Sequence, residues 1–258
     1  MDRGSFLGVL LGFTLLAVAI GLGPNPRIFL HPAGLIVVVG GVTAATLLRF
    51  PLEHVSYAFS IANRAFFTRT PETQALVNQI VGLSQRARRE GLLNMEKAMD
   101  VEGFLAKGLR MVVDHSERDH IQAVLAQELR ATQDRHHQGQ EIFRFIALSA
   151  PSFGMVGTLI GMVQLFASIK DPSNIGGAMA LSLLSTLYGA VIAYLLAIPI
   201  AGKLELRSRE ELQLKGIMLE GVLGIQAEMH PSALEAQLNA FLAPRERGGF
   251  ERRAVPRG

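Results

Sequence analysis

The sequence predicts an all-α membrane protein with four transmembrane helices and a helical cytoplasmic domain between the second and the third. Three observations predict this fold. Only 18% of the 258 residues are charged, against roughly 25% in soluble domains. Four runs of at least 21 residues contain no Asp, Glu, Lys or Arg, and roughly 20 apolar residues in a helix cross a bilayer core. Between these runs, apolar residues recur at helical spacing, with no strand-like alternation.

The charge-free runs define the transmembrane helices in chain order. We expect these helices at 4–26, 28–50, 145–169 and 177–202. A second interpretation applies to the first run, where Ala17-Val18-Ala19 has the form of a signal-peptidase site. Cleavage there would leave three spans and the same orientation for the rest of the chain.

The basic residues predict the orientation of the spans, because cytoplasmic loops collect Lys and Arg. The segment 51–144 carries 12 of the 25 basic residues, and the segment 203–258 carries 9. The link between the first two spans carries only Arg27, and the link between the last two carries only Lys170. We therefore expect a multi-pass protein with both termini in the cytoplasm and two short links outside.

The long loop 51–144 is predicted to be a cytoplasmic helical domain. Thr70, Pro71 and Glu72 have the form of a helix start, a hydroxyl cap followed by proline at the first helical position. Ser116 is predicted to begin a second helix, with Asp119 three residues later. We expect the third and fourth spans to extend into the cytoplasm as long helices.

The region after the fourth span divides into two parts. Charged and apolar residues alternate over 203–242, which predicts cytoplasmic C-terminal helices continuing from the span. The last part, 243–258, is rich in Arg, Gly and Pro and predicts a disordered basic tail attracted to anionic membrane lipid. A specific contact of this tail with a partner is the alternative. The basic residues thus have a membrane use, and we expect no binding to nucleic acid.

The chemistry that the sequence lacks excludes several functions. The chain has no Cys, which excludes a disulfide scaffold, and its seven His residues form no metal signature. We find no grouping of Ser, His and Asp and no phosphate-binding loop, so we expect no enzyme. The spans contain no carboxylate, although ion passage across a bilayer usually requires one at depth. If the protein handles ions, a partner must supply the acid.

Several residues in and near the spans are candidates for function, each with a structural alternative. Thr158, Ser185, Thr186 and Tyr188 place hydroxyls at depth, where they can ligate a partly dehydrated cation or only satisfy helix contacts. Pro151 and Pro199 lie at the cytoplasmic ends of the third and fourth spans and form either a hinge or two harmless kinks. Two motifs of the form GxxxG allow close helix packing, one at Gly8 and Gly12 and one at Gly157 and Gly161. A cluster of loop charges fits either a docking patch or a solvated helix end. It comprises Arg86, Arg88, Arg89, Glu90, Glu96, Asp100 and Glu102.

Three stretches of the spans have a distinctive sequence. The stretch at 150–161 reads APSFGMVGTLIG and the stretch at 184–190 reads LSTLYGA. A less specific stretch at 35–41 reads LIVVVGG. These stretches resemble the MotA/PomA family, the ion-driven stator subunits of the bacterial flagellar motor within the MotA/TolQ/ExbB group. The resemblance extends over about 4–242 and includes the position of the large loop after the second span.

The resemblance implies a function and an assembly. In this family, five subunits are thought to ring two single-span partners of the MotB/PomB type, each with a membrane Asp and a peptidoglycan-binding domain. Ion passage past that Asp is taken to turn the ring in the inner membrane, so that the cytoplasmic domain 51–144 applies torque to the rotor protein FliG. The transported ion is Na⁺ or H⁺, with no other cofactor.

The resemblance also implies roles for particular residues, with Tyr188 added as a further hydroxyl at depth. The implied ion pathway is Thr158, Thr186 and Tyr188, and Na⁺ is favoured because both Thr residues are present. The implied coupling residues are Pro151 and Pro199. The implied rotor interface is Arg88, Arg89, Glu96, Lys203, Lys215 and Glu220. Departures from the family pattern occur at Glu90 and Ser185.

Two other functions remain as alternatives. The chain could be an energiser of the ExbB/TolQ type, powering a TonB- or TolA-type machine. Such proteins usually have three spans and a main cytoplasmic domain after the first, which differs from the layout predicted here. The other alternative is a passive membrane scaffold whose ring only holds a partner.

Overall fold

The structure is a computed structural model that describes the chain apart from five stretches. Three predictions fall in these stretches and so lie outside the described residues: the helix start at Thr70 and Pro71, the rotor-interface charge Glu96, and the basic tail. The stretches are 1–2, 68–71, 92–102, 171 and 243–258.

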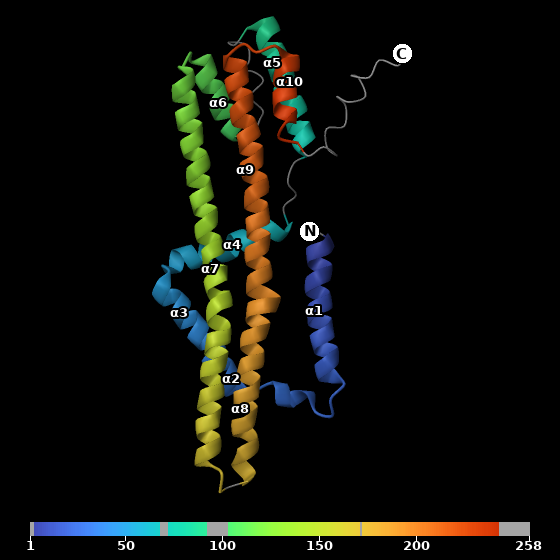
Figure 1. Cartoon of the computed structure of the whole chain (residues 1–258), viewed down its shortest axis with the longest axis vertical. Helices are drawn as coiled ribbons and strands as arrows, with labels where there is room; N and C mark the ends of the chain where they lie inside the picture. The colour runs from blue at the N-terminus through green and yellow to red at the C-terminus, as the bar shows by residue number, and fades with distance from the viewer. Residues whose placement is uncertain (1–2, 68–71, 92–102, 171, 243–258) are drawn as a thin grey trace. The chain divides into compact units, whose positions relative to one another are not determined.

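The described residues form helices and no strands, which confirms the predicted all-α class. Two segments, Ile36–Gly40 and Val191–Ala197, are π-helical, and Pro26–Phe29 forms one short 3-10 helix. Figure 1 labels the α-helices along the chain. They are α1 (Arg3–Gly21), α2 (Pro32–Leu35), α3 (Gly41–Arg49), α4 (Leu52–Phe67), α5 (Thr73–Glu90), α6 (Gly103–Val113), α7 (Arg118–Ala167), α8 (Pro172–Ala190), α9 (Ile198–Gln226) and α10 (Pro231–Asn239).

The chain divides into two compact units, and the division does not follow the predicted sequence ranges. Unit 1 comprises Met1–Arg69 and His136–Leu206, and unit 2 comprises Thr70–Arg135 and Arg207–Gly258. Thus both ends of the loop 51–144 belong with the spans, while its middle part 70–135 packs with residues from the C-terminal helices. The reason is that α7 and α9 contribute residues to both units, so side-chain packing rather than chain order decides the grouping.

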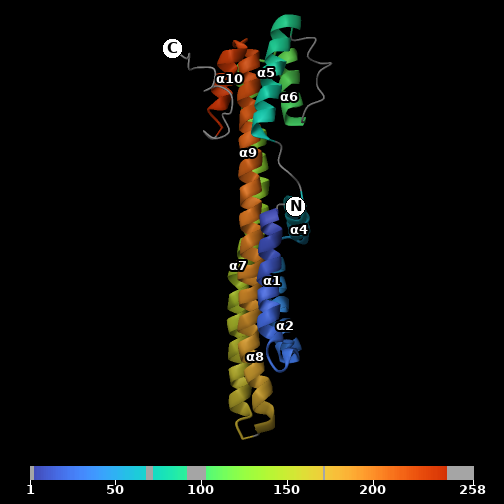
Figure 2. The same cartoon turned by 90° about the vertical axis from the view of Figure 1, so that its right-hand side faces the viewer.

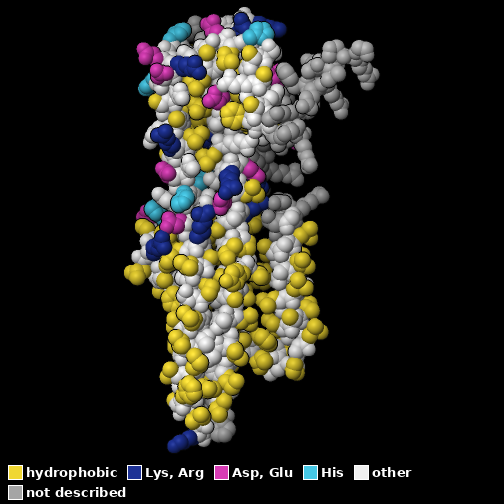
Figure 3. Space-filling view, viewed as in Figure 1, with side chains coloured by type: hydrophobic (Ala, Val, Ile, Leu, Met, Phe, Trp, Pro, Cys, Tyr) yellow, Lys and Arg dark blue, Asp and Glu magenta, His cyan; other side chains and the backbone are white. Residues whose placement is uncertain are grey.

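Unit 1 holds the apolar helices. Among the residues that the structure describes, three helical stretches are long and apolar enough to cross a membrane, namely Pro26–Arg49, Arg118–Ala167 and Ile175–Gln226. The first predicted span forms α1, whose apolar part Leu7–Gly21 is shorter. Figure 3 shows hydrophobic side chains over α8, without charged side chains on the visible face. The last two stretches confirm the prediction that the third and fourth spans continue as long helices beyond their apolar parts.

The lower parts of α7 and α8 lie side by side in both Figure 1 and Figure 2. Glycines make this approach possible. A Cβ on Gly161 would lie 2.7 Å from the carbonyl oxygen of Ala178, and one on Gly189 would lie 2.5 Å from that of Ala150. Small residues at such contacts let two backbones come close enough to pack without side chains between them. The GxxxG motif at Gly157 and Gly161 therefore serves packing within the chain.

The helix α4 packs across α7 and α9 inside unit 1. Its fully buried Ala58 joins Phe143 of α7 and Leu204 of α9 in one apolar cluster. The Phe59 ring meets the Phe143 ring edge to face, at 5.1 Å between centroids, a favoured geometry for aromatic pairs. This cluster explains why residues directly after the second span belong to the unit of the spans.

Unit 2 is a small helical domain with its own core. Apolar residues of α5, α6, α10 and the unit 2 parts of α7 and α9 form one buried cluster that includes Ile80, Leu109, Ile121, Ile217 and Leu234. The apolar spacing predicted for two helices of the long loop is confirmed by α5 and α7, whose buried faces point into this core. The second of these helices begins at Arg118, two residues after Ser116.

Candidate functional site

A cluster of hydroxyl groups joins α7 to α8 inside unit 1. The Oγ1 atoms of Thr158 and Thr186 lie 2.6 Å apart. The Thr158 hydroxyl also lies 3.0 Å from the carbonyl oxygen of Ser182, and the Ser182 hydroxyl donates to the carbonyl of Thr158 at 3.1 Å. The structure thus brings together two of the predicted ion-pathway residues, and it adds Ser182, which the sequence analysis missed. Ser182 could have been identified from the sequence, because it lies four residues before Thr186 and therefore on the same face of the helix.

The hydroxyl cluster lies at the surface of unit 1. Thr186 is exposed and Thr158 is half-buried, whereas Ser182 and Ser185 are buried. The Ser185 hydroxyl donates to the carbonyl of Leu181 in its own helix at 2.7 Å, so it is engaged in a local helix bond. Within the described part of the chain, no cluster of His, Cys, Asp and Glu could hold a metal ion. Thr158 and Thr186 therefore offer a pair of hydroxyl oxygens from α7 and α8 at the surface of unit 1.

Tyr188 anchors the link before the second span. Its hydroxyl donates to the carbonyl of Phe29 at 2.5 Å and accepts from the backbone N–H of His31 at 2.9 Å. The imidazole Nδ1 of His31 in turn accepts from the backbone N–H of Gly34 at 3.3 Å and caps α2. Since both hydrogen-bonding capacities of the Tyr188 hydroxyl are used, the geometry favours an anchoring role over direct ion contact. The capping role of His31 could have been recognised in the sequence, because Pro32 follows it and proline is common at the first position of a helix.

The two coupling prolines occupy different helical environments. Pro151 lies inside α7, which continues through it. Serines on either side supply local bonds: the Ser149 hydroxyl donates to the carbonyl of Phe145, and the Ser152 hydroxyl donates to that of Leu148 at 3.1 Å. Proline frees a carbonyl one turn earlier in its helix, and such serine bonds are known to bend helices.

Pro199 follows directly on the π-helical segment Val191–Ala197. The backbone N–H of Ile198 donates to the carbonyl of Ala193, five residues earlier, instead of to the residue four earlier. Proline has no N–H and therefore cannot donate the usual hydrogen bond to the carbonyl four residues earlier. The wider π-helical turn before Pro199 lets the helix accommodate this missing bond. Pro199 is exposed and lines a cavity of about 530 Å³ together with Lys203, Tyr194 and residues of α1.

The predicted rotor-interface residues fall into two groups. Arg88 and Arg89 are exposed in the last turn of α5, where positive charge is favourable next to the carbonyl end of a helix. Lys203, by contrast, has only 8% of its surface exposed in the single chain, and its contact with the rotor stays a prediction. The carboxylate of Glu220 accepts from Gln237 of α10 at 3.0 Å.

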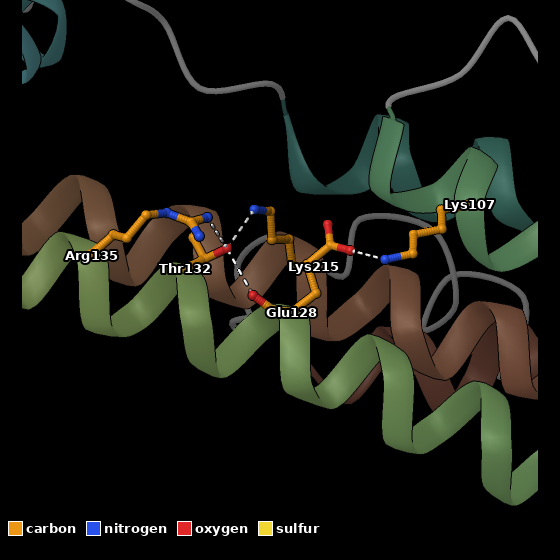
Figure 4. Close-up of polar contacts among 5 residues, drawn as sticks. All are labelled: Lys107, Glu128, Thr132, Arg135 and Lys215. Carbon is orange, nitrogen blue, oxygen red and sulfur yellow. Dashed lines mark hydrogen bonds and ion pairs between the residues drawn. The ribbon is translucent and has the colours of Figure 1, made fainter.

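Lys215 also points into the protein, where it forms part of a polar network (Figure 4). Its side chain is only 12% exposed and pairs with Glu211 at 3.0 Å. Its Nζ atom donates to the hydroxyl of the buried Thr132 at 3.2 Å and lies 5.7 Å from the ring centre of Phe104. Arg135 donates to the same hydroxyl at 3.1 Å. The helices α6, α7 and α9 thus enclose this side chain, and its contact with the rotor stays a prediction.

We predict that Lys215→Met lowers the free energy of unfolding of the full chain by about 1–3 kcal/mol, the usual effect of breaking buried hydrogen bonds of a charged group. Thermal unfolding of the purified protein measures the change. Lys107→Met is the matched control, because Lys107 forms an ion pair of 2.6 Å with Glu128 while its side chain is 48% exposed. That exposed pair contributes less than about 1 kcal/mol. Equal shifts for the two variants would contradict the internal role of Lys215.

Comparisons with known proteins agree on one family. A family model described as the MotA/TolQ/ExbB proton channel family matches residues 97–216. Chemotaxis protein PomA of Vibrio alginolyticus is 35% identical over 242 residues, covering 94% of this chain and 96% of that protein. Motility protein A of Treponema pallidum (strain Nichols) is 33% identical over 253 residues, covering 97% and 98%.

A solved structure has the same fold over almost the whole chain. It is the flagellar MotAB stator complex from Bacillus subtilis, with a TM-score of 0.88, 28% identity, and coverage of 96% of this chain and 99% of that one. The match includes the spans and unit 2, so it extends well beyond the residues of the family model. The chain therefore belongs to the MotA/TolQ/ExbB proton channel family, and within it to the MotA/PomA stator subunits.

Proposed function

We propose that this chain is the ring-forming subunit of an ion-driven stator of the bacterial flagellar motor. The observation that carries the proposal is the surface pair of hydroxyls at Thr158 and Thr186, in spans that contain no carboxylate. Two aligned hydroxyl oxygens can replace part of the hydration shell of a cation, but a charged group is still required at depth. The likeness to PomA and to a MotAB stator complex supports this function.

The missing acid defines the partner. We infer that several copies of the chain surround a single-span subunit of the MotB/PomB type, whose membrane Asp lies opposite the hydroxyl pair. Five copies around two partners is the arrangement that the family resemblance implies. The transported ion is Na⁺ in this proposal, because two Thr side chains offer oxygen ligands without a proton to exchange near neutral pH. The chain itself has no catalytic role.

The orientation follows from charge. The protein lies in the bacterial inner membrane, with both termini and unit 2 in the cytoplasm, because basic residues concentrate in the segments 51–144 and 203–258. In this arrangement, the prolines Pro151 and Pro199 lie between the ion pathway and unit 2. We propose that they transmit movement of the spans to unit 2, whose exposed charges then act on the rotor protein FliG.

A complementation experiment tests the proposal. The gene is expressed together with its single-span partner in a flagellated strain that lacks its own stators, and swimming is recorded. Swimming that depends on both genes supports the stator function. Cells that assemble flagella but do not rotate them in spite of membrane insertion would instead favour an energiser or a scaffold.

We predict that Arg88→Glu combined with Glu96→Lys abolishes or severely reduces swimming in that strain. Reversal places like charges opposite each other at the rotor contact, which weakens docking. Arg118→Glu is the control, because Arg118 is exposed in the first turn of α7, where an acidic residue is favourable. Normal swimming of the double variant at normal protein abundance would remove the torque assignment.

A further inference from the structure

A small polar pocket lies in unit 2 where α5 and α9 end. It has a volume of about 280 Å³ and is lined by Ser84, Ala87, Arg88, Ile225 and Glu228. One wall thus carries a cationic side chain from α5, and the other carries an anionic side chain from the turn after α9. Both Arg88 and Glu228 are exposed.

The pocket forms because α5 and α9 pack in parallel. Gly221 of α9 lies against Ile80 of α5, where an added Cβ would come within 2.6 Å of the Ile80 side chain. One to two turns further along both helices, Arg88 and Glu228 face the same space. The carbonyl ends of both helices therefore meet at this pocket. Carbonyl ends favour the positive charge of Arg88 and disfavour the negative charge of Glu228.

Glu228 also occupies a backbone conformation that suits glycine. Its φ is 53°, one of two positive values among the described non-glycine residues. It closes α9 through two bonds, from its own N–H to the carbonyl of Ile225 and from the N–H of Met229 to the carbonyl of Gly224, each 3.0 Å. This is a Schellman ending, and the residue at its left-handed position is usually Gly.

The side chain of Glu228 therefore stands against two local preferences, the backbone conformation and the helix dipole. Neither Arg88 nor Glu228 forms an ion pair with another residue in the part of the chain that the structure describes. A strained residue without a stabilising role in its own fold points to a function. A carboxylate and a guanidinium across one open pocket are arranged to meet a surface of the opposite pattern.

We propose that Glu228 and Arg88 together form a docking pocket for the rotor protein, in which Glu228 binds a basic side chain and Arg88 an acidic one. The inference rests on the proposed function and adds a residue from α9 to the rotor contact. Two opposite charges in one pocket determine how the partner aligns with it, because a partner displaced along the pocket would bring like charges next to each other. The partner surface is thus a helix end or turn that presents an acidic and a basic side chain side by side.

The experiment compares two glycine variants of the full chain. Glu228→Gly removes the carboxylate and also relieves the backbone strain. His115→Gly is the matched control, because His115 has a φ of 55° and closes α6 with the same pair of bonds, without lining the pocket. Each variant is co-expressed with its single-span partner in the stator-deficient strain. The melting temperature of the purified protein, the swimming speed and the binding of purified FliG are measured.

We expect both glycine variants to raise the melting temperature by about 2–4 °C, the shift typical of one relieved local strain in a chain of this size. Only Glu228→Gly and Glu228→Gln weaken FliG binding, by roughly fivefold, the upper range for one exposed ion pair. Glu228→Asp retains most of the binding. Unchanged FliG binding in both Glu228→Gly and Glu228→Gln overturns the proposal.

A cross-linking measurement separates this inference from the proposed function. The chain has no Cys, so Glu228→Cys introduces a single thiol that can be oxidised to a disulfide with single-Cys variants of FliG in cells. We expect a cross-linked product from position 228 and none from His115→Cys. If the unmodified chain does not restore swimming, the stator function fails; if it does and position 228 never cross-links, only the docking pocket fails.

Discussion

We expect a strain that carries Gly189→Val to lose the protein from its membrane. A Cβ at this position would lie 2.5 Å from the carbonyl oxygen of Ala150 and 3.2 Å from the Cα atom of Pro151. These are backbone atoms, which cannot move aside as a flexible side chain would. Overpacking a well-packed contact costs about 1–3 kcal/mol or more, and valine adds two further methyl groups. We expect α7 and α8 to separate and the chain to be degraded.

The measurement for Gly189 is the abundance of the full chain in isolated membranes, together with its melting temperature in detergent. Gly189→Ala should show the same effect at reduced size. The control is Gly40→Ala, since a Cβ at Gly40 has nothing within 4 Å and alanine is favoured over glycine in a helix by about 0.5–1 kcal/mol. The close packing of α7 on α8 would be refuted if both alanine variants accumulated and melted alike.

Thr158→Ala should reduce motor rotation by about tenfold and weaken its dependence on sodium concentration. The Thr158 hydroxyl lies 2.6 Å from that of Thr186 and 3.0 Å from the carbonyl of Ser182, so its loss removes one oxygen and releases the other. A lost hydrogen bond or ligand at a charged group is worth about 1.5–3 kcal/mol, and each 1.4 kcal/mol is a factor of ten. Swimming speed measured against sodium concentration tests this.

Three further variants sharpen the test of the hydroxyl pair. Thr158→Ser keeps the oxygen atom and should retain most of the speed. Ser168→Ala should have no effect, because that hydroxyl bonds only within its own helix, at 2.7 Å to the carbonyl of Gln164. Thr186→Ala combined with Thr158→Ala should be far from additive, as expected for two side chains in contact. An unchanged sodium dependence in Thr158→Ala would leave H⁺ as the coupling ion.

The sequence predicted the all-helical class and the long third and fourth helices, because one physical rule governs apolar spans. Charge is costly in hydrocarbon, so the charge-free runs had to coincide with the apolar helices, and helices satisfy their backbone groups internally. The helical spacing of Leu76 and Ile80 likewise predicted the buried face of α5, which the core of unit 2 confirms. The depth of Thr158 and Thr186 placed them among four hydroxyl candidates, and the family resemblance assigned them to the ion pathway.

Other features depended on contacts that periodicity does not encode. Lys215 resembles an exposed charge in a charged helix, yet α6 and α7 enclose it beside Thr132. Tyr188 was expected along the ion pathway, and its hydroxyl is bonded to Phe29 and His31. The spacing of residues along one helix shows which of them share a face. It does not show which neighbouring helix covers that face, or which residues of that helix lie opposite.

By itself, the sequence determined which runs are long and apolar enough to span a membrane, and it predicts the orientation of the loops and a partner that supplies the membrane acid. These conclusions need only the transfer cost of charge and the length of a helix. The tertiary structure decided that Thr158 contacts Thr186 and that Arg88 and Glu228 line one pocket at the end of unit 2. The physical reason is that helix register depends on the fit of two surfaces, such as Gly189 against Ala150, and this fit exists only once both helices are packed.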